Sequence, residues 1–247
     1  MRKFLTGFSI ILATFSAHAA ETTIAVAANF AEPMKQIAAG FQRATGHVVI
    51  ISTGATGKFY TQIVNGAPFD ALLAADSETP AKLIAEKHAV VGSAFTYATG
   101  KLVLWSAKPG FIDAQATALK TGRFAHLALA SPKLAPYGRA AVETLAALKL
   151  DVPPGKIVTG ENIAQTFQFV ASGNAELGFV ALSQVWKDGK LTSGSGWIVP
   201  ATLHAPIKQD AVLLDKGRDN AAAIALLAYL KSSAARAVIQ GFGYGIY

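Results

Sequence analysis

The sequence predicts an α/β protein of two lobes, each a mixed, mostly parallel sheet flanked by helices, with a ligand cleft between the lobes. Two observations predict this class. Short apolar segments typical of strands alternate with amphipathic segments typical of helices along the chain, a pattern that favours parallel pairing. Two turn-rich stretches, 97–101 and 197–206, then offer places where the chain leaves one lobe and later returns to it.

The strand-like segments are short apolar runs at 22–28, 47–52, 69–75, 101–106, 126–130, 156–160, 176–181 and 208–214. The helix-like segments lie between them, at 30–44, 57–65, 79–88, 138–149, 163–171, 182–187, 218–231 and 233–241. In the first helix Phe30, Met34 and Phe41 lie along one stripe, which is the spacing of a helix that packs one face on a sheet. Strands separated by helices in this way imply sheets that are largely parallel.

The two turn-rich stretches also define the predicted domains. One lobe is discontinuous and takes residues 20–99 plus 202–247, whereas the other takes residues 100–201. Each lobe then has roughly 100 residues or more, a usual size for a domain with its own core.

The first 19 residues have the pattern of a secretory signal. Arg2 and Lys3 form a basic start, an apolar core runs over 8–15, and Ala17-His18-Ala19 is a small-x-small cleavage site. Cleavage after Ala19 leaves 247 − 19 = 228 residues, and no later apolar run reaches the about 18 residues of a membrane span. We therefore expect a protein free in the periplasm of a Gram-negative cell. An uncleaved N-terminal anchor is the alternative.

Composition excludes several classes of function. The chain has no cysteine, which excludes disulfides, thiolate metal sites, cysteine nucleophiles and a lipidated N-terminal cysteine. The formal net charge is +7, or +5 without Arg2 and Lys3. Because the basic residues are scattered and not clustered in an arm or patch, a nucleic-acid partner is not expected.

Two strand-to-helix junctions in the first half have the features of an anion site. Asn29 follows the strand at 22–28, with Glu32 in capping-box spacing, and Thr56 ends the loop 52–57 before the next helix. Helix N-termini leave backbone N–H groups without partners, and these stabilise anions without a cationic side chain. Simple helix capping is the alternative for both junctions. A P-loop is excluded because Ser52 stands where its first glycine belongs.

The second half offers two matching junctions. Pro136 precedes Tyr137 at one predicted helix start, and Asn162 precedes Ile163 at another, with Gln165 completing a capping box. These starts leave the backbone N–H groups of Tyr137 and Ile163 unpaired. Open α/β sheets bind ligands at the carboxyl ends of their strands, so the four junctions are expected to face one cleft.

At these residues the chain resembles the periplasmic molybdate-binding proteins of ABC importers, over nearly all of the mature chain. The segments that carry the resemblance are Ala-Ala-Asn-Phe at 27–30, Ser-Thr-Gly-Ala-Thr-Gly at 52–57, 62–70, Ala-Ala-Asp at 74–76, 100–106, Ala-Pro-Tyr-Gly at 135–138 and 175–181. Their combined order is more specific than any one of them. The resemblance implies a type II periplasmic binding protein fold that closes on a tetrahedral dianion held by hydroxyls and backbone amides.

Carried over by position, the resemblance implies ligand contacts from Ala28, Asn29, Thr56, and the backbones of Tyr137 and Ile163. The ligand would be molybdate or tungstate, with no cofactor, no catalytic residue and no direct ligand to a metal cation. The protein would be a monomer that delivers the oxyanion to a membrane permease.

The sequence departs from many relatives at two places. It has Ala28 where many have Ser or Thr, and Ala181 where some have a Tyr that contacts the ligand. The chain thus resembles the branch of the family that lacks this Tyr. Asp70 and Asp76 lie near strand ends and are expected to be structural, capping or hinge residues, although either could supply an acceptor if it faced the cleft.

Other functions remain as alternatives. A binding protein for another tetrahedral oxyanion, sulfate above all, has the same donor requirements. A periplasmic hydrolase is disfavoured because no G-x-S-x-G motif is present and the histidines lack metal-ligand spacing. An iron(III) receptor is disfavoured by dispersed tyrosines, and an organic-solute receptor by the lack of any basic candidate beyond Arg139.

Overall fold

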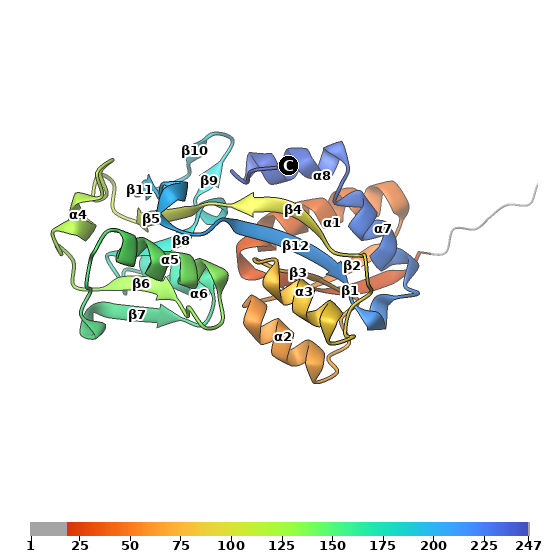
Figure 1. The fold of residues 1–247 in the computed structure, drawn as a ribbon. Helices are drawn as coiled ribbons and strands as arrows, with labels where there is room; N and C mark the ends of the chain where they lie inside the picture. The colour runs from red at the N-terminus through yellow and green to blue at the C-terminus, as the bar shows by residue number, and fades with distance from the viewer. Residues whose placement is uncertain (1–18, 247) are drawn as a thin grey trace, which may run out of the picture.

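The computed structural model describes residues 19–246, which form two lobes, each around a five-stranded sheet (Figure 1). The first sheet has the order β2 (Val48–Gly54), β1 (Glu21–Ala27), β3 (Ala71–Leu73), β12 (Ile207–Leu213), β4 (Phe95–Gly100). The second has the order β11 (Ser195–Ile198), β5 (Leu102–Ser106), β8 (Leu177–Ala181), β6 (Leu127–Ala130), β7 (Ile157–Gly160). A small hairpin, β9 (Trp186–Lys187) and β10 (Lys190–Leu191), accompanies the second sheet. The predicted signal at 1–19 falls almost wholly outside the described residues.

Seven of the eight α-helices in the described residues lie where the sequence predicts them, with shifts at their ends, whereas α4 was not predicted. They are α1 (Ala31–Thr45), α2 (Thr56–Val64), α3 (Glu78–Ala85), α4 (Thr117–Lys120), α5 (Pro136–Ala147), α6 (Ile163–Ala171), α7 (Ala221–Tyr229) and α8 (Ser233–Gly241). Single 3-10 turns are η1 (Ala28–Phe30), η2 (Pro154–Lys156), η3 (Leu182–Gln184), η4 (Ala201–Leu203) and η5 (Asp215–Gly217). The helix predicted at 182–187 is wrong beyond its first turn, because the chain passes from η3 into strand β9. Helix α7 begins at Ala221, later than predicted, because Asn220 caps it there.

Both sheets are mixed, as predicted, but their parallel share is smaller than expected. In the first sheet β1 pairs in parallel with β2 and β3, whereas β12 is antiparallel to β3 and β4. The second sheet has the same mixture of parallel and antiparallel pairs. Strand β6 is parallel to β7 and β8, and β5 is antiparallel to β8 and β11. Strands β4 and β11, and the short strands of the β9–β10 hairpin, were not predicted. Strands β4 and β11 are antiparallel strands at the edges of their sheets and carry weaker apolar patterns.

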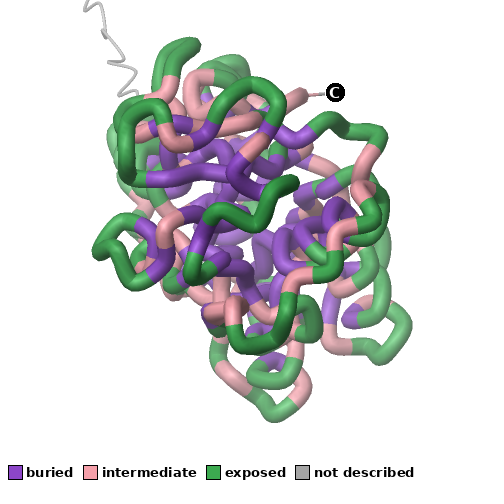
Figure 2. Tube along the Cα trace, turned by 90° about the vertical axis from the view of Figure 1, so that its left-hand side faces the viewer, coloured by how far each residue is buried: buried purple, intermediate pink, exposed green. Residues whose placement is uncertain are grey.

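Alternation along the strands gives each sheet two buried faces. In β1, Ile24 and Val26 pack in the cluster with α1, α7 and α8, whereas Ala25 packs with α2 and α3. In β5, Leu104 packs in the cluster with α5 and Trp105 in the one with α6. Side chains in a strand point alternately to opposite faces, so each face of each sheet is covered by helices. Figure 2 shows buried segments inside and exposed loops around them.

The chain passes between the sheets at two points that lie close together. Strand β4 ends at Gly100 and β5 begins at Leu102, so the first crossing takes one residue. The return runs from β11 to β12, and β4 and β12 are themselves neighbours in the first sheet (Figure 1). We propose lobe boundaries at 99/100 and 201/202 because every strand of the second sheet lies between these points.

Within residues 19–246 no single helix has both the length and the apolar character needed to cross a membrane. Only α7 and α8 taken together would pass on length and composition, and they are bent by 63° to each other.

Candidate functional site

The four predicted junctions meet at one small pocket between the lobes. In the first lobe its walls come from the end of β1 with η1, the end of β2 with the start of α2, and Ala75, two residues after β3 ends. In the second lobe they come from the starts of α5 and α6. The lining residues are Ala27, Ala28, Asn29, Gly54, Ala55, Thr56, Ala75, Ala135, Pro136, Tyr137, Asn162 and Ile163. The structure therefore brings all five predicted site residues together. The cavity volume is only about 10 Å³, close to the space of one water-sized sphere.

Asn29 lies in the pocket wall, but its side chain does not cap a helix as predicted. The residues that precede η1 and α1 are Ala27 and Phe30, and neither helix has a side-chain cap. The Asn29 amide Nδ2 instead donates to Gln209 Oε1 at 2.8 Å and to the Tyr244 hydroxyl at 2.9 Å. The side chain is thus anchored behind the pocket. The backbone N–H groups of Ala28 and Asn29, at the start of η1, have no partner within the helix.

Thr56 is the first residue of α2, and it is almost fully buried. Its hydroxyl oxygen accepts the backbone N–H of Ala75 at 3.0 Å. Because a hydroxyl has one proton and two lone pairs, the accepted bond leaves the proton of Thr56 available to donate. Within residues 19–246 no acceptor for that proton is recorded, and the residue lines the pocket.

Tyr137 is placed by the local start of α5. Pro136 opens the helix without an N–H, and Gly138 and Arg139 donate their backbone N–H groups to Ala135. The Tyr137 N–H is left at the pocket, as predicted. Its phenol is buried, and the hydroxyl has no hydrogen-bond partner among the described residues. Burial raises the pKa of Tyr137 well above its usual value.

Ile163 begins α6 directly after its cap residue. The Asn162 side chain accepts the N–H groups of Ala164 and Gln165, both at 3.0 Å, so the predicted N-cap is confirmed. The predicted capping box differs in its partner, since Gln165 Oε1 accepts the N–H of Glu161 at 2.6 Å. The first N–H of the helix, from Ile163, remains at the pocket.

Comparison with known proteins places this site in a family. The sequence profile described as bacterial extracellular solute-binding protein matches residues 22–245. The chain belongs to this family. A molybdate-binding protein of Azotobacter vinelandii is 61% identical over 94% of this chain and 92% of its own length. A molybdate-binding protein of Rhodobacter capsulatus is 51% identical over 92% of this chain and 89% of its own.

A solved structure of the Azotobacter vinelandii periplasmic molybdate-binding protein superposes with a TM-score of 0.88 at 40% sequence identity. The match covers 92% of this chain and 99% of that one. The resemblance to molybdate-binding proteins drawn from the sequence is therefore confirmed, and so is the two-lobed fold that it implied.

The electrostatics of the pocket in this solute-binding protein come from backbone groups. None of the described residues that line it is Lys or Arg. The starts of α2, α5 and α6 are all in its wall, and each helix start carries a partial positive charge from its unpaired N–H groups. Among the described residues no group of acidic, histidine or cysteine side chains could hold a metal ion. The arrangement is suited to an anion.

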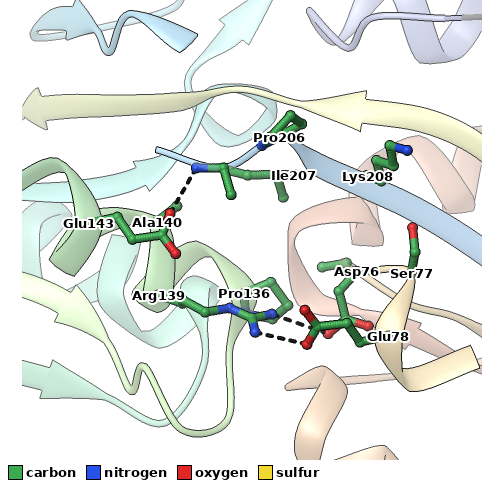
Figure 3. A pocket seen from close by; sticks show the side chains of 12 residues that line it. Asp76, Ser77, Glu78, Pro136, Arg139, Ala140, Glu143, Pro206, Ile207 and Lys208 are labelled. Atoms are coloured by element: carbon green, nitrogen blue, oxygen red, sulfur yellow. Dashed lines mark hydrogen bonds and ion pairs between the residues drawn. The ribbon is translucent and has the colours of Figure 1, made fainter. Parts of the chain in front are cut away.

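Charged side chains gather beside this pocket and not inside it. A neighbouring cavity of about 230 Å³ (Figure 3) is lined on one side by Asp76 and Glu78 and on the other by Arg139 and Glu143. Arg139 Nη1 lies 2.9 Å from Glu78 Oε2, and Nη2 lies 3.9 Å from Asp76 Oδ2. The ion pairs therefore join α5 of one lobe to the start of α3 in the other.

The two aspartates named in the sequence analysis have structural roles. Asp76 Oδ1 accepts the N–H of Thr79 in the first turn of α3 at 2.9 Å. Asp70 Oδ2 accepts from the backbone of Thr23 at 2.8 Å and from Asn220 Nδ2 at 3.0 Å. Burial raises the pKa of Asp76, against the lowering effects of the Thr79 hydrogen bonds and of Arg139.

Further contacts hold the lobes together around the pocket. The Gly57 N–H donates to the Leu134 carbonyl at 2.9 Å, and Lys58 Nζ lies 2.5 Å from Glu161 Oε1. Both contacts link the start of α2 to the junctions of the other lobe. The two pocket walls are therefore in direct contact across the lobes in this structure.

Sequence reasoning missed several residues that shape the site. Ala75 lines the pocket and donates its backbone N–H to the Thr56 hydroxyl, but the sequence marks only the Ala-Ala-Asp motif that contains it. Gln209 and Tyr244 anchor Asn29 from the far end of the chain, and no local pattern marks them. Ala181, the departure from some relatives, is buried at the end of β8 and does not line the pocket.

Proposed function

We propose that the chain is a periplasmic binding protein, and not an enzyme, that captures molybdate between its two lobes. The observation that carries the proposal is the pocket itself, where the starts of helices from both lobes converge on a very small space without a cationic side chain. The identity with molybdate-binding relatives over nearly the whole chain supports the choice of ligand.

The proposed contacts follow from the donors in the wall. The hydroxyl of Thr56 and the backbone N–H groups of Asn29, Tyr137 and Ile163 would each donate to an oxygen of the dianion, with the N–H of Ala28 beside them. Burying a dianion is costly unless it is fully hydrogen-bonded. Several charge-assisted hydrogen bonds, together with the helix N-termini, offset that cost.

The size and polarity of the pocket favour a compact ligand. A cavity of about 10 Å³ in this arrangement is far smaller than the roughly 300 Å³ or more of organic-ligand sites, so a small tetrahedral oxyanion needs the least further opening of the pocket. A wall of donors also disfavours a protonated oxyanion, whose hydroxyl needs an acceptor. Tungstate presents the same tetrahedral dianion, so we propose that it binds as well.

The remaining parts of the proposal concern cellular context. We propose export to the periplasm with cleavage after Ala19, action as a monomer, and delivery of the oxyanion to the membrane permease of an ABC importer. The support is the Azotobacter vinelandii relative, which is described as periplasmic, together with the signal pattern at 1–19.

Parallel calorimetric titration of the mature protein with molybdate, tungstate, sulfate and phosphate tests the function. We expect tight one-to-one binding of molybdate and tungstate, weaker binding of sulfate and none of phosphate. Molybdate at saturating concentration should also raise the melting temperature, because a ligand that binds only the native state stabilises it. Tighter binding of sulfate than of molybdate would replace the proposed ligand with sulfate, and binding of none of the four would overturn the proposal.

A further inference from the structure

A buried group of polar side chains lies directly behind the pocket and draws on both lobes. We call it the hinge cluster, and it consists of Asn29, Ser183, Gln209 and Tyr244. Asn29, Gln209 and Tyr244 come from the first lobe, whereas Ser183 lies in η3, after the last residue of β8 in the second. All four are buried. The hydrogen bonds among these four residues favour a single local geometry, and among the described residues only the Gln209 Nε2 atom of the cluster is buried without a partner.

The hydrogen bonds of the hinge cluster converge on one residue. The carbonyl of Asn29 accepts from the Ser183 hydroxyl at 2.8 Å and from the Tyr244 hydroxyl at 2.8 Å. The side-chain amide of Asn29 donates to Tyr244 at 2.9 Å and to Gln209 at 2.8 Å. Asn29 is therefore held at both its backbone and its side chain. With these two attachments fixed, the backbone N–H of Asn29, which lines the pocket, is held in one direction.

Tyr244 reaches this position because the C-terminal segment lies across the junction of the lobes. The Gly245 N–H donates to Thr99 in strand β4 at 2.9 Å, and Thr99 donates back at 2.8 Å. On the other side the Asp188 N–H donates to Gly241 at 3.1 Å. The segment 241–245 thus contacts the edge of the first sheet and the hairpin of the second lobe.

The C-terminal segment packs closely against the second lobe at Gly243. A Cβ atom on Gly243, which has φ +82°, would lie 2.9 Å from Trp186 Cδ1 and 3.0 Å from Leu182 Cδ2. Only glycine suits both this conformation and this space. Leu182, just before Ser183, and Trp186, three residues after it, therefore pack on the same segment that carries Tyr244.

The protonation of Tyr244 is suited to a permanent hydrogen-bonding role. Its single hydroxyl proton is shared between Asn29 O at 2.8 Å and Ser183 Oγ at 3.0 Å, and its oxygen accepts from Asn29 Nδ2 at 2.9 Å. Burial raises the pKa of Tyr244 to about 12, so the phenol keeps its proton at any physiological pH.

We propose that Tyr244 and Ser183 are positioning residues for oxyanion binding, which hold Asn29 so that its N–H donates to the bound ligand. Ser183 is supplied by the second lobe, so its hydrogen bond to Asn29 also ties the geometry of this donor to the relative position of the lobes. This inference rests on the proposed function. It adds two residues that do not touch the ligand, one of them at the C-terminal end of the chain.

The test uses two variants that each lose one hydroxyl group of the hinge cluster. Each has a control variant that loses the same kind of hydroxyl elsewhere. Tyr244→Phe and Ser183→Ala remove the two hydroxyls. Tyr60→Phe removes a phenol hydroxyl that bonds exposed Glu86, away from the pocket. Ser195→Ala removes a serine hydroxyl that is equally buried (8% exposed against 7% for Ser183) but bonds Lys108 and Ile112 in the second lobe.

Molybdate affinity by calorimetry and the melting temperature of the ligand-free protein are measured for all five proteins and the Tyr244→Phe/Ser183→Ala double variant. We expect each hinge-cluster variant to lose about tenfold in affinity, and the double variant to lose less than the product because both hydroxyls hold the same carbonyl. The control variants should keep the wild-type affinity even where their melting temperature falls.

The outcomes separate this inference from the proposed function. If the unchanged protein binds molybdate and both hinge-cluster variants bind it equally well, the positioning role is wrong and the proposed function stands. If Ser195→Ala loses as much affinity as Ser183→Ala, the loss reflects general destabilisation, and the inference also fails. If the unchanged protein binds no oxyanion, the proposed function and the inference fail together.

Discussion

The backbone N–H of Gly57 donates to the carbonyl of Leu134 at 2.9 Å across the two lobes. A Cβ atom on Gly57 would lie 3.2 Å from both the Cα and the carbonyl oxygen of Leu134, which is tighter than an ordinary contact. Gly57 follows Thr56 in the pocket wall, and Leu134 precedes Ala135 in the facing wall. The missing side chain therefore lets the two walls close on each other.

Gly57→Ala should weaken molybdate binding, because the added methyl group would press the two pocket walls apart. Alanine is favoured over glycine within a helix by up to about 1 kcal/mol, which should offset part of the stability lost where its methyl group presses on the Leu134 backbone. We expect a few-fold loss of affinity for Gly57→Ala and a larger loss for Gly57→Val. Calorimetry and thermal unfolding measure the two effects.

Gly155→Ala is the control for this prediction, since a Cβ atom there meets nothing within 4 Å. It should leave affinity unchanged. If Gly57→Ala and Gly57→Val both bind molybdate as tightly as the unchanged protein, the closed contact has no part in binding.

Thr56→Ala should lower molybdate affinity by about 10- to 100-fold, because a hydrogen bond to a charged group contributes about 1.5–3 kcal/mol. The same change leaves the Ala75 N–H without its acceptor, so some loss of stability will accompany it. Thr56→Ser keeps both hydrogen bonds and should retain most of the affinity.

Thr61→Ala serves as the matched control on the same helix. Its hydroxyl donates to the Gly57 carbonyl on the exposed side, so the substitution should change affinity little. Equal affinities for Thr56→Ser and Thr56→Ala would show that the hydroxyl does not contact the ligand.

The two asparagines of the site show where sequence reasoning succeeds and where it stops. Asn162 bonds N–H groups two and three residues further along the chain, so a local pattern predicts its role. Asn29 has the same local pattern, yet its side-chain partners Gln209 and Tyr244 lie 180 and 215 residues away. The side-chain amide of Asn29 bonds these distant buried groups in place of capping the helix beside it. No rule that uses only neighbouring residues can foresee that choice.

The fold shows the same limit at its edges. Central strands such as β6, Leu127–Ala130, are buried on both faces, so their sequences are continuous apolar runs that stand out. The edge strand β4 mixes Thr96 and Thr99 with apolar residues, and its partner β12 is more than 100 residues away. The site could be located despite these misses, because the ends of the parallel strands place the junctions on one side of each sheet.

Asn162→Ala should reduce both stability and molybdate affinity. Loss of an N-cap costs about 1 kcal/mol, and it also frees the first turn of α6, from which the Ile163 N–H faces the pocket. We expect a several-fold loss of affinity together with a lower melting temperature, measured by calorimetry and thermal unfolding.

Asn220→Ala separates the two effects. Asn220 caps α7 with the same pair of hydrogen bonds, to Ala222 at 3.0 Å and Ala223 at 3.3 Å, but it does not line the pocket. It should lose at least as much stability and keep its affinity. A parallel loss of affinity in both variants would mean that binding responds to stability alone.

Asp76→Asn should remove the part of the pH dependence of the free energy of unfolding that comes from this carboxyl group. Burial raises the pKa of Asp76 above 3.8 in the folded protein, so between pH 3.8 and the raised value the native state binds more protons than the unfolded state. The free energy of unfolding therefore falls as pH rises through this window and recovers as pH is lowered. Asparagine has no such proton, and its Oδ1 can still accept the Thr79 N–H.

The free energy of unfolding of Asp76→Asn and of the unchanged protein is compared by chemical denaturation from pH 3.5 to pH 7. The variant should be equally or more stable at pH 7, and this advantage should shrink toward pH 3.8, because the unchanged Asp76 then becomes neutral. Asp113→Asn gives the opposite sign, since hydrogen bonds from Thr117 and Gln115 lower the pKa of Asp113. Its carboxylate stabilises the fold above pH 3.8, and that contribution is lost as pH falls through the lowered pKa. If Asp76→Asn were less stable at pH 7 by an amount that shrinks on acidification, the Thr79 and Arg139 contacts would outweigh burial at this carboxylate.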